Sequence, residues 1–275
     1  MDAYTACFVS SVVLLAGCGA PAAGATTSGS DAGDARSDAG ADEVGRPDGP
    51  GDARPAPVYA TCGKPPYVTF HLRAGEIHVD GSTGALADAT LGFDLCPGFA
   101  QTTDRNGDAR ASVQRGVAFT AVVRAPGHVT VMTGEELIPI DEAIDEERVI
   151  ELLPLVGTSS GAVPGYSADA PSFAVVIQPD PTDPPCNETI EVKLSLGDHP
   201  EAKVHYTLPG WPSDTTEVIE GTSIGPVAFF TGIVGAEVTA LQGTHPHCRV
   251  SVATSHQTGR FPMQPGVLTV GNVRL

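Results

Sequence analysis

Short runs of alternating apolar and polar residues, separated by turn residues, limit the folds open to this chain. The first set occupies residues 67–72, 76–79, 89–93, 109–113, 117–124 and 129–131. Because successive side chains of a strand point to opposite faces, this alternation predicts half-buried strands. Gly (32) and Pro (24) make up about a fifth of the residues, which is typical of chains with many turns. We therefore expect an antiparallel sandwich with one face in water.

Alternating runs resume after a stretch rich in Gly and Pro. They occupy residues 173–177, 189–196, 203–208, 227–230, 237–241, 249–253 and 267–275. The run at 189–196 places four apolar residues on one face of a strand: Ile190, Val192, Leu194 and Leu196. A chain of 275 residues has room for two domains. The second set of strands predicts a second sandwich.

Four features between residues 73 and 155 recur together in one family of sandwich domains. They are Gly75, the stretch 83–89, the turn from Thr103 to Gly107, and residues 124–128. In these features the chain resembles the carboxypeptidase regulatory-like domain, although His128 stands where many relatives have an aromatic residue. The resemblance implies a transthyretin-like, Ig-like sandwich that acts as a folding accessory or binding module and has no catalytic activity. It is vaguer in the second half, where it rests on residues 225–238.

The N-terminus carries an apolar run at residues 6–16 that ends in Leu15, Ala16, Gly17 and Cys18. The run has the length of a signal peptide and is too short to span a bilayer. Its end resembles the lipobox of bacterial lipoproteins. The resemblance implies that a signal peptidase recognises Leu15, Ala16 and Gly17 and that Cys18 becomes the lipidated N-terminus.

Two neighbouring features bear on this interpretation. Residues 1–5 contain no Lys or Arg, whereas such signals usually begin with a basic segment, which an upstream start would supply. A hydrophobic first strand or helix is the alternative. Gly19, in place of an aspartate, favours the outer membrane.

Residues 19–57 consist mainly of Ala, Gly, Asp, Ser and Pro and contain no aromatic residue. Such a segment cannot bury enough apolar surface to offset its ordering entropy, so we expect a disordered acidic linker with a reach of about 35 Å. The expected segments are a signal peptide at 1–17, this linker at 18–60, the first sandwich at 61–156, an interdomain linker at 157–172 and the second sandwich at 173–275. The predicted fold class is all-β, with two Ig-like or transthyretin-like β-sandwich domains.

The balance of 15 Lys and Arg against 33 Asp and Glu gives a formal net charge of −18. This charge repels phosphate backbones and argues against nucleic-acid binding. Neutral or basic partners are expected instead.

Four of the six cysteines fall in the expected folded part: Cys62, Cys96, Cys186 and Cys248. An even number of cysteines in an exported protein favours disulfides. Pairing Cys62 with Cys96 and Cys186 with Cys248 keeps each bridge within one domain, although four cysteines allow three connectivities.

Two sequence motifs of hydrolases can be compared with this chain. Residues 157–161 match the G-x-S-x-G pattern around Ser159, but Pro164 and Gly165 follow where a nucleophile elbow needs a helix. None of the eight histidines has Glu at the third following position, as a His-x-x-Glu zinc pair requires. We therefore predict no catalytic residue, no cofactor and no enzyme activity.

Two further groups resemble metal sites. Asp104, Asn106 and Asp108 alternate around Gly107 as calcium ligands do, but no bidentate Glu completes the loop, which favours a tight turn. His245 and His247 flank Pro246 as zinc ligands might, with possible third ligands far away in the sequence at His199, His205 and His256. Histidines beside a disulfide at Cys248 are the favoured interpretation, so we expect no metal. Trp211 lies in a turn where it offers an aromatic platform to a sugar or peptide, or folds back onto the sandwich.

These features favour a lipid-anchored protein of the cell envelope whose sandwiches bind a carbohydrate, a peptide or an envelope protein. A purely structural surface scaffold is the first alternative, and a hydrolase that uses Ser159 is the second.

Overall fold

The structure is a computed structural model that describes residues 59–78, 82–141, 146–152, 166–183, 186–209, 217–219, 221–252 and 256–275. All the regular elements in these ranges are β-strands, which confirms the all-β prediction. None of the described residues forms a helix of the length and apolar character that a membrane span requires. The predicted signal peptide, the N-terminal linker up to residue 58 and most of the interdomain linker lie outside the described residues.

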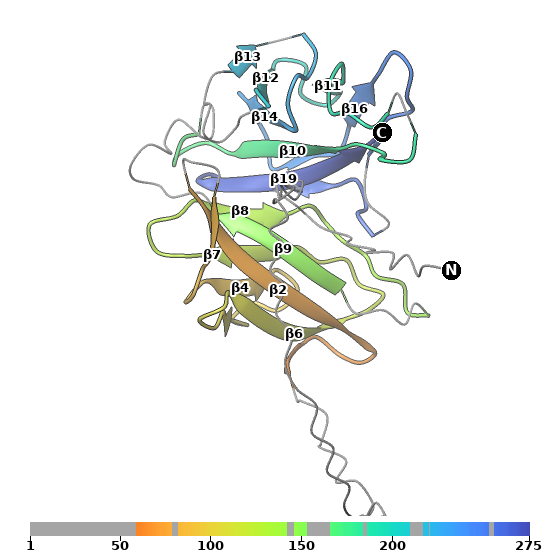
Figure 1. Ribbon diagram of the computed structural model, residues 1–275. Helices are drawn as coiled ribbons and strands as arrows, with labels where there is room; N and C mark the ends of the chain where they lie inside the picture. The colour runs from red at the N-terminus through yellow and green to blue at the C-terminus, as the bar shows by residue number, and fades with distance from the viewer. Residues whose placement is uncertain are drawn as a thin grey trace, which may run out of the picture. The chain divides into compact units, whose positions relative to one another are not determined.

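One sheet of five strands belongs to the first half of the chain (Figure 1). Its order is β1 (Ala60–Cys62), β6 (Asp108–Gln114), β2 (Tyr67–Ile77) and β3 (Thr83–Ala85), with β9 (Glu146–Leu152) paired to β2. Buried residues alternate with partly or fully exposed ones along β6 and along the first part of β2, as the sequence pattern predicts.

A second sheet of ten strands runs through both halves of the chain. Its order is β13 (Glu217–Ile219), β12 (Lys203–Thr207), β14 (Val227–Thr231), β10 (Ser172–Gln178), β19 (Val267–Arg274), β8 (Thr130–Thr133), β7 (Ala121–Arg124), β4 (Thr90–Phe93) and β5 (Gln101–Thr102), with β17 (Ser251–Val252) paired to β19. The division into two domains stays a prediction, and the pairing of β8 with β19 joins the two stretches of chain.

Two short sheets cover the part of the ten-stranded sheet that the second half contributes. One pairs β11 (Lys193–Leu196) with β16 (Leu241–Thr244), and the other pairs β15 (Glu237–Val238) with β18 (Phe261–Pro262). Each half of the chain is therefore a sandwich of two layers, and the layers of both sandwiches include strands of the same long sheet.

The central strands β10 and β19 are buried on both faces. The expectation from the sequence was that one face of each sheet lies in water. Along β10, Ala174 and Val176 pack into the core that includes the five-stranded sheet, whereas Phe173 and Val175 pack into the core of the second half. Seven of the eight residues of β19 are buried. Strands buried on both faces have near-continuous apolar sequences instead of alternating ones, and residues 173–177 are such a run.

The expected antiparallel arrangement holds for most strand pairs but not for all of them. Four strand pairs are parallel: β1 with β6, β2 with β9, β8 with β19 and β10 with β19. Alternation specifies which side chains point inward, but it carries no information on the direction of the neighbouring strand.

Two clusters of aromatic rings lie on opposite faces of the long sheet. Phe70, Phe93 and Phe119 meet edge to face, with ring centroids 5.3 to 6.2 Å apart. On the other face the ring centroids of Phe173 and Phe261 are 4.9 Å apart. Gly271 of β19 makes room for this pair, since a Cβ there would lie 2.7 Å from the Phe261 ring.

The expected strand at residues 189–196 begins late. Glu191 has a φ of 60°, which L-residues rarely adopt, so regular pairing starts at Lys193. Val192, Leu194 and Leu196 are buried as predicted, but Ile190 is 38% exposed. The left-handed residue thus removes Ile190 from the apolar face.

The structure contains two disulfides, between Cys62 and Cys96 and between Cys186 and Cys248. Of the three connectivities open to four cysteines, this one keeps each bridge within one half. The bonded cysteines are 34 residues apart in the sequence in the first bridge and 62 residues apart in the second.

We predict that the two disulfides contribute similar amounts to stability. Loop-closure entropy depends only on the logarithm of the loop length, so replacing either pair by alanine should lower the free energy of unfolding by about 4 kcal/mol. Urea unfolding of both double variants measures this. A loss below about 1 kcal/mol in either variant would contradict it.

Candidate functional site

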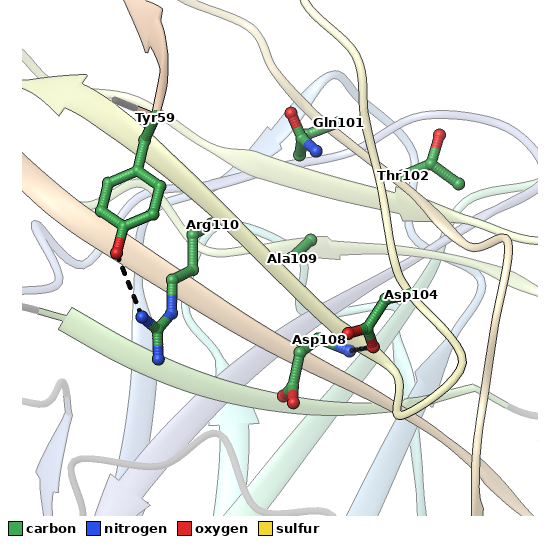
Figure 2. A pocket seen from close by; sticks show the side chains of 7 residues that line it. All are labelled: Tyr59, Gln101, Thr102, Asp104, Asp108, Ala109 and Arg110. Atoms are coloured by element: carbon green, nitrogen blue, oxygen red, sulfur yellow. Dashed lines mark hydrogen bonds between the residues drawn. The ribbon is translucent and has the colours of Figure 1, made fainter. Parts of the chain in front are cut away.

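A pocket of about 420 Å³ lies between β1, β5 and β6 (Figure 2). The residues that line it are Tyr59, Gln101, Thr102, Asp104, Asp108, Ala109 and Arg110. Six of these seven carry a polar group, and one of the six is aromatic. The pocket therefore offers many hydrogen-bonding groups.

The alternation of β6 explains why polar side chains gather here. Ala109, Ala111 and Val113 point into the core, so Asp108 and Arg110 face outward. The strand β5 belongs to the other sheet and brings Gln101 and Thr102 to the same place.

Tyr59 and Arg110 form one wall of the pocket. Nη1 of Arg110 donates a hydrogen bond of 3.1 Å to the Tyr59 hydroxyl, as Figure 2 shows. The guanidinium carbon also lies 5.9 Å from the centroid of the Tyr59 ring, within the range of a cation–π contact. Because β1 runs parallel to β6 with Ala60 opposite Ala111, the preceding residue Tyr59 comes to lie beside Arg110.

The turn at residues 104–108 forms a second wall. Oδ1 of Asp104 accepts hydrogen bonds from the backbone N–H groups of Asn106 (2.8 Å) and Asp108 (3.1 Å). Gly107 has a φ of 78°, and a Cβ at this position would collide with the carbonyl oxygen of Ala74. The structure thus shows the tight turn that the sequence favoured over a calcium loop.

These backbone bonds set the charge state of Asp104. The bond from Asp108, followed by that from Asn106, lowers the pKa of the Asp104 carboxyl below its ordinary value of 3.8. Hydrogen bonds to the charged form of a carboxylate stabilise that form. Asp104 is therefore an anion and a hydrogen-bond acceptor at neutral pH.

Asp108 is held by two side chains of the neighbouring strand. Its Oδ1 lies 3.2 Å from Nε2 of His71 and accepts a hydrogen bond of 3.2 Å from Nε of Arg73. Arg73 lies directly opposite Asp108 in the register of β2 and β6, which explains the contact. The floor of the pocket is therefore ordered by the sheet.

Gln101 and Thr102 complete the pocket from β5. Their side chains make no hydrogen bond to any described residue. An amide and a hydroxyl each donate and accept, so these two side chains offer both functions to a bound molecule.

The pocket lining lacks several of the side chains that nucleophilic catalysis commonly uses. None of its lining residues is a Ser, Cys or His, and the carboxylates of Asp104 and Asp108 already accept hydrogen bonds from neighbouring groups. A general acid needs a raised pKa, whereas the pKa of Asp104 is lowered. The arrangement is suited to holding a ligand by hydrogen bonds.

The histidines singled out in the sequence have other roles. Nδ1 of His245 accepts hydrogen bonds of 3.1 Å from the backbone N–H groups of His247 and Cys248. His199 bonds to the carbonyl oxygen of Glu237 and His205 to Oγ1 of Thr231, while His256 is buried. Within the described ranges no group of three or more His, Cys, Asp or Glu side chains is placed to hold a metal ion.

Other predicted site residues lie outside the described part of the chain. They are Leu15, Ala16, Gly17 and Cys18 of the lipobox, Ser159 of the G-x-S-x-G pattern and Trp211. Their roles stay predictions.

Tyr59, Gln101, Thr102 and Arg110 were not anticipated as site residues. Tyr59 was assigned to the linker at 18–60, although it is the first aromatic residue after a long stretch without any. That change of composition was the available signal. Nothing in the sequence indicated that Tyr59 and Arg110, which are far apart in the chain, lie side by side.

Comparisons with known proteins show no family. No family model matches the chain, and no curated protein matches it. Among solved structures it is similar to the TIE protein of Bacillus anthracis, at 12% identity over 76% of this chain and 34% of that one, with a TM-score of 0.24. A streptococcal ancillary pilin is 11% identical over 75% of this chain and 62% of that one, also with a TM-score of 0.24.

A third similar structure is the shaft pilin spaA from Lactobacillus rhamnosus GG. It is 9% identical over 76% of this chain and 97% of that one, with a TM-score of 0.24. The chain spans about a third of the TIE protein and 62% of the ancillary pilin. Likenesses with TM-scores this low carry no weight for function, and the resemblance to the carboxypeptidase regulatory-like domain stays a prediction.

We predict that Asp104 stays ionised to a pH below 3.8, because the two backbone N–H groups stabilise its charged form. A lowered folded-state pKa stabilises the fold above the ordinary value, and this contribution disappears as the pH falls through the folded-state pKa. An NMR titration of the Asp104 carboxyl carbon measures the midpoint. A midpoint at or above 3.8 would contradict the turn geometry.

Proposed function

We propose that this protein is a non-catalytic binding protein of the bacterial cell envelope, held to a membrane by lipid on Cys18, that binds a neutral saccharide in the pocket between β1, β5 and β6. The observation that carries the proposal is the lining of that pocket, which consists of one aromatic residue, five other residues with polar side chains and Ala109. The ligand, the anchor and the regulatory-like classification of the first sandwich all belong to the proposal.

Hydroxyl-rich ligands need donors and acceptors in close alternation. The pocket supplies donors from Arg110 and Gln101 and acceptors from Asp104 and Asp108, and Thr102 serves as both. Its charged residues are two acids and one base, so no strong charge selects a phosphate or a cation. The net charge of −18 further disfavours anionic ligands.

Two features support a location outside the cytoplasm. Both disulfides join cysteines within the folded part, and structural disulfides are rare in reducing compartments. The lipobox at Leu15 to Cys18 supplies the route of export and the anchor. A cell-envelope location, with the outer membrane favoured by Gly19, is therefore proposed.

The pocket chemistry supports a non-catalytic role. Hydrolysis of a glycosidic bond uses one carboxylic acid that is protonated at the working pH. The lowered pKa of Asp104 and the contacts of Asp108 with Arg73 and His71 keep both pocket acids engaged as acceptors. Binding without turnover follows from this arrangement.

We predict that Arg110→Ala weakens saccharide binding at least about tenfold, since it removes a charged donor and releases the Tyr59 hydroxyl. Isothermal titration calorimetry with neutral trisaccharides of glucose, mannose, xylose and N-acetylglucosamine measures this. Arg274→Ala is the matched control, because Arg274 is exposed and lies at the end of β19 outside the pocket.

The two variants separate the outcomes. Equal binding by both variants would place the ligand elsewhere. Failure of the wild-type protein to bind any of these saccharides would favour a peptide or protein ligand or the scaffold role, and the saccharide proposal would be wrong.

The lipid anchor is tested by mass and by fractionation. We predict that the mature protein begins at Cys18 and carries the added mass of a diacylglycerol, and that Cys18→Ala moves it from the membrane fraction to the soluble fraction. Cys7→Ala, in the predicted signal peptide, is the control and should leave both results unchanged. A mature chain that still begins at Met1, or membrane-bound Cys18→Ala, would exclude the anchor.

A further inference from the structure

We infer that the disulfide between Cys62 and Cys96 holds the Tyr59 wall of the pocket in place against the wall formed by β5, so that the binding site is complete only in the oxidised protein. The inference concerns the regulation of the pocket and rests, for its ligand, on the proposed function. Its structural part concerns only the placement of Tyr59 and β1 relative to β5.

The strand β1 has little of its own to hold it in place. It has three residues and pairs with β6 alone, at the edge of its sheet. Two of its residues, Ala60 and Thr61, are exposed, and only Cys62 is buried in the core. Short edge strands with few buried contacts open readily. Tyr59 precedes this strand directly, so its position depends on β1.

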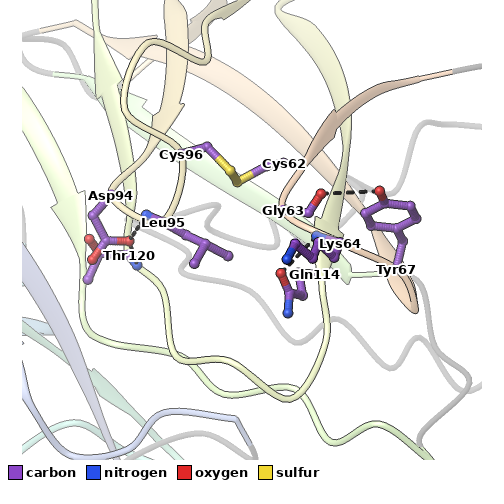
Figure 3. The surroundings of a disulfide bond; sticks show 9 residues. All are labelled: Cys62, Gly63, Lys64, Tyr67, Asp94, Leu95, Cys96, Gln114 and Thr120. Carbon is purple, nitrogen blue, oxygen red and sulfur yellow. Dashed lines mark hydrogen bonds between the residues drawn. A yellow bond between two sulfur atoms is a disulfide. The ribbon is translucent and has the colours of Figure 1, made fainter.

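The disulfide joins a strand of the five-stranded sheet to a loop between two strands of the ten-stranded sheet (Figure 3). Cys62 ends β1 in the five-stranded sheet, and Cys96 lies in the loop that leads from β4 to β5 in the ten-stranded sheet. Tyr59 lies shortly before Cys62 in the chain, and Gln101 and Thr102 lie shortly after Cys96. One covalent bond thus links the segments that form these two walls. No hydrogen-bonded ladder links β1 with β5, since β1 pairs with β6 and β5 with β4.

The loop around Cys96 is itself anchored. Oδ1 of Asp94 accepts hydrogen bonds from the backbone N–H groups of Leu95 (2.8 Å) and Thr120 (2.7 Å). The N–H of Phe99 donates to the carbonyl oxygen of Cys96 at 2.9 Å, which shapes the turn before β5. Cys62 is therefore bonded to a rigid point, and the bond restrains β1.

The segment after Cys62 is held independently of the disulfide. Figure 3 shows the N–H of Lys64 donating to Oε1 of Gln114 and the hydroxyl of Tyr67 donating to the carbonyl oxygen of Gly63. Loss of the disulfide should therefore loosen the chain on the N-terminal side of Cys62 while β2 stays paired. The expected effect is local, at Tyr59 and β1.

The second disulfide provides a matched control. It closes a loop of 62 residues against 34 for the first, so its removal costs stability to a similar degree, but it lies in the other half of the chain. The experiment compares Cys62→Ala/Cys96→Ala with Cys186→Ala/Cys248→Ala in the full chain. Hydrogen exchange of the backbone amides at residues 60–62 and 101–102 is measured first, without ligand.

We expect exchange at residues 60–62 to rise at least about tenfold in the first variant and to stay within about twofold of wild type in the second. Calorimetry with the trisaccharide that wild-type protein binds should show affinity reduced at least about tenfold in the first variant alone. If the alanine variant does not fold, Cys62→Val/Cys96→Ala keeps an apolar side chain in the buried position and takes its place.

Each result decides the inference. Equal exchange in the two variants, or unfolding of both replacements for the first pair, would show that the bond stabilises the whole fold and does not position the site. Absence of saccharide binding by wild-type protein would end the proposed function, while the exchange data would still decide the role of the disulfide.

Discussion

The burial of β10 and β19 on both faces is the constraint on which the rest of the fold depends. Each strand supplies side chains to two cores, so neither half of the chain can complete its sandwich without them. The parallel pairing of β8 with β19 carries the sheet from one half into the other. Even the aromatic pair of Phe173 and Phe261 requires a glycine in β19, because the rings occupy the space of a side chain at Gly271. Packing of this kind tolerates little change in volume.

The pocket lies away from these strands, between β6 of the five-stranded sheet and β5 at the edge of the ten-stranded sheet. Its floor is the regular strand β6, whose outward residues Asp108 and Arg110 are set by alternation. Its walls come from short segments, β1, β5 and the turn at Asp104, which regular pairing secures weakly. Side-chain contacts and one disulfide supply the missing order. In sandwich proteins, binding sites are commonly formed by loops and strand ends that a rigid sheet supports.

Much of the local structure could be predicted from particular residues. The alternation of Val68, Phe70 and Leu72 predicted β2, and Gly107 between two aspartates predicted the tight turn. Predictions failed where distant segments meet. The parallel partners of β2 and β19, the exposure of Ile190 and the place of Tyr59 in a pocket depend on neighbours that no local pattern reveals.

The sequence by itself determined the all-β class, the inward and outward faces of most strands and a chemistry without a recognisable catalytic motif, since these follow from side-chain type and local spacing. It also predicts a lipobox at Cys18, because such a motif is defined by a short linear stretch of sequence. Tertiary structure alone decided that the two halves share a sheet and that β10 and β19 are buried on both faces. It also decided that Tyr59, Gln101 and Arg110 line one pocket. The physical reason is that strand direction and partner choice are set by the burial of whole faces against each other, to which residues far apart in the chain contribute together.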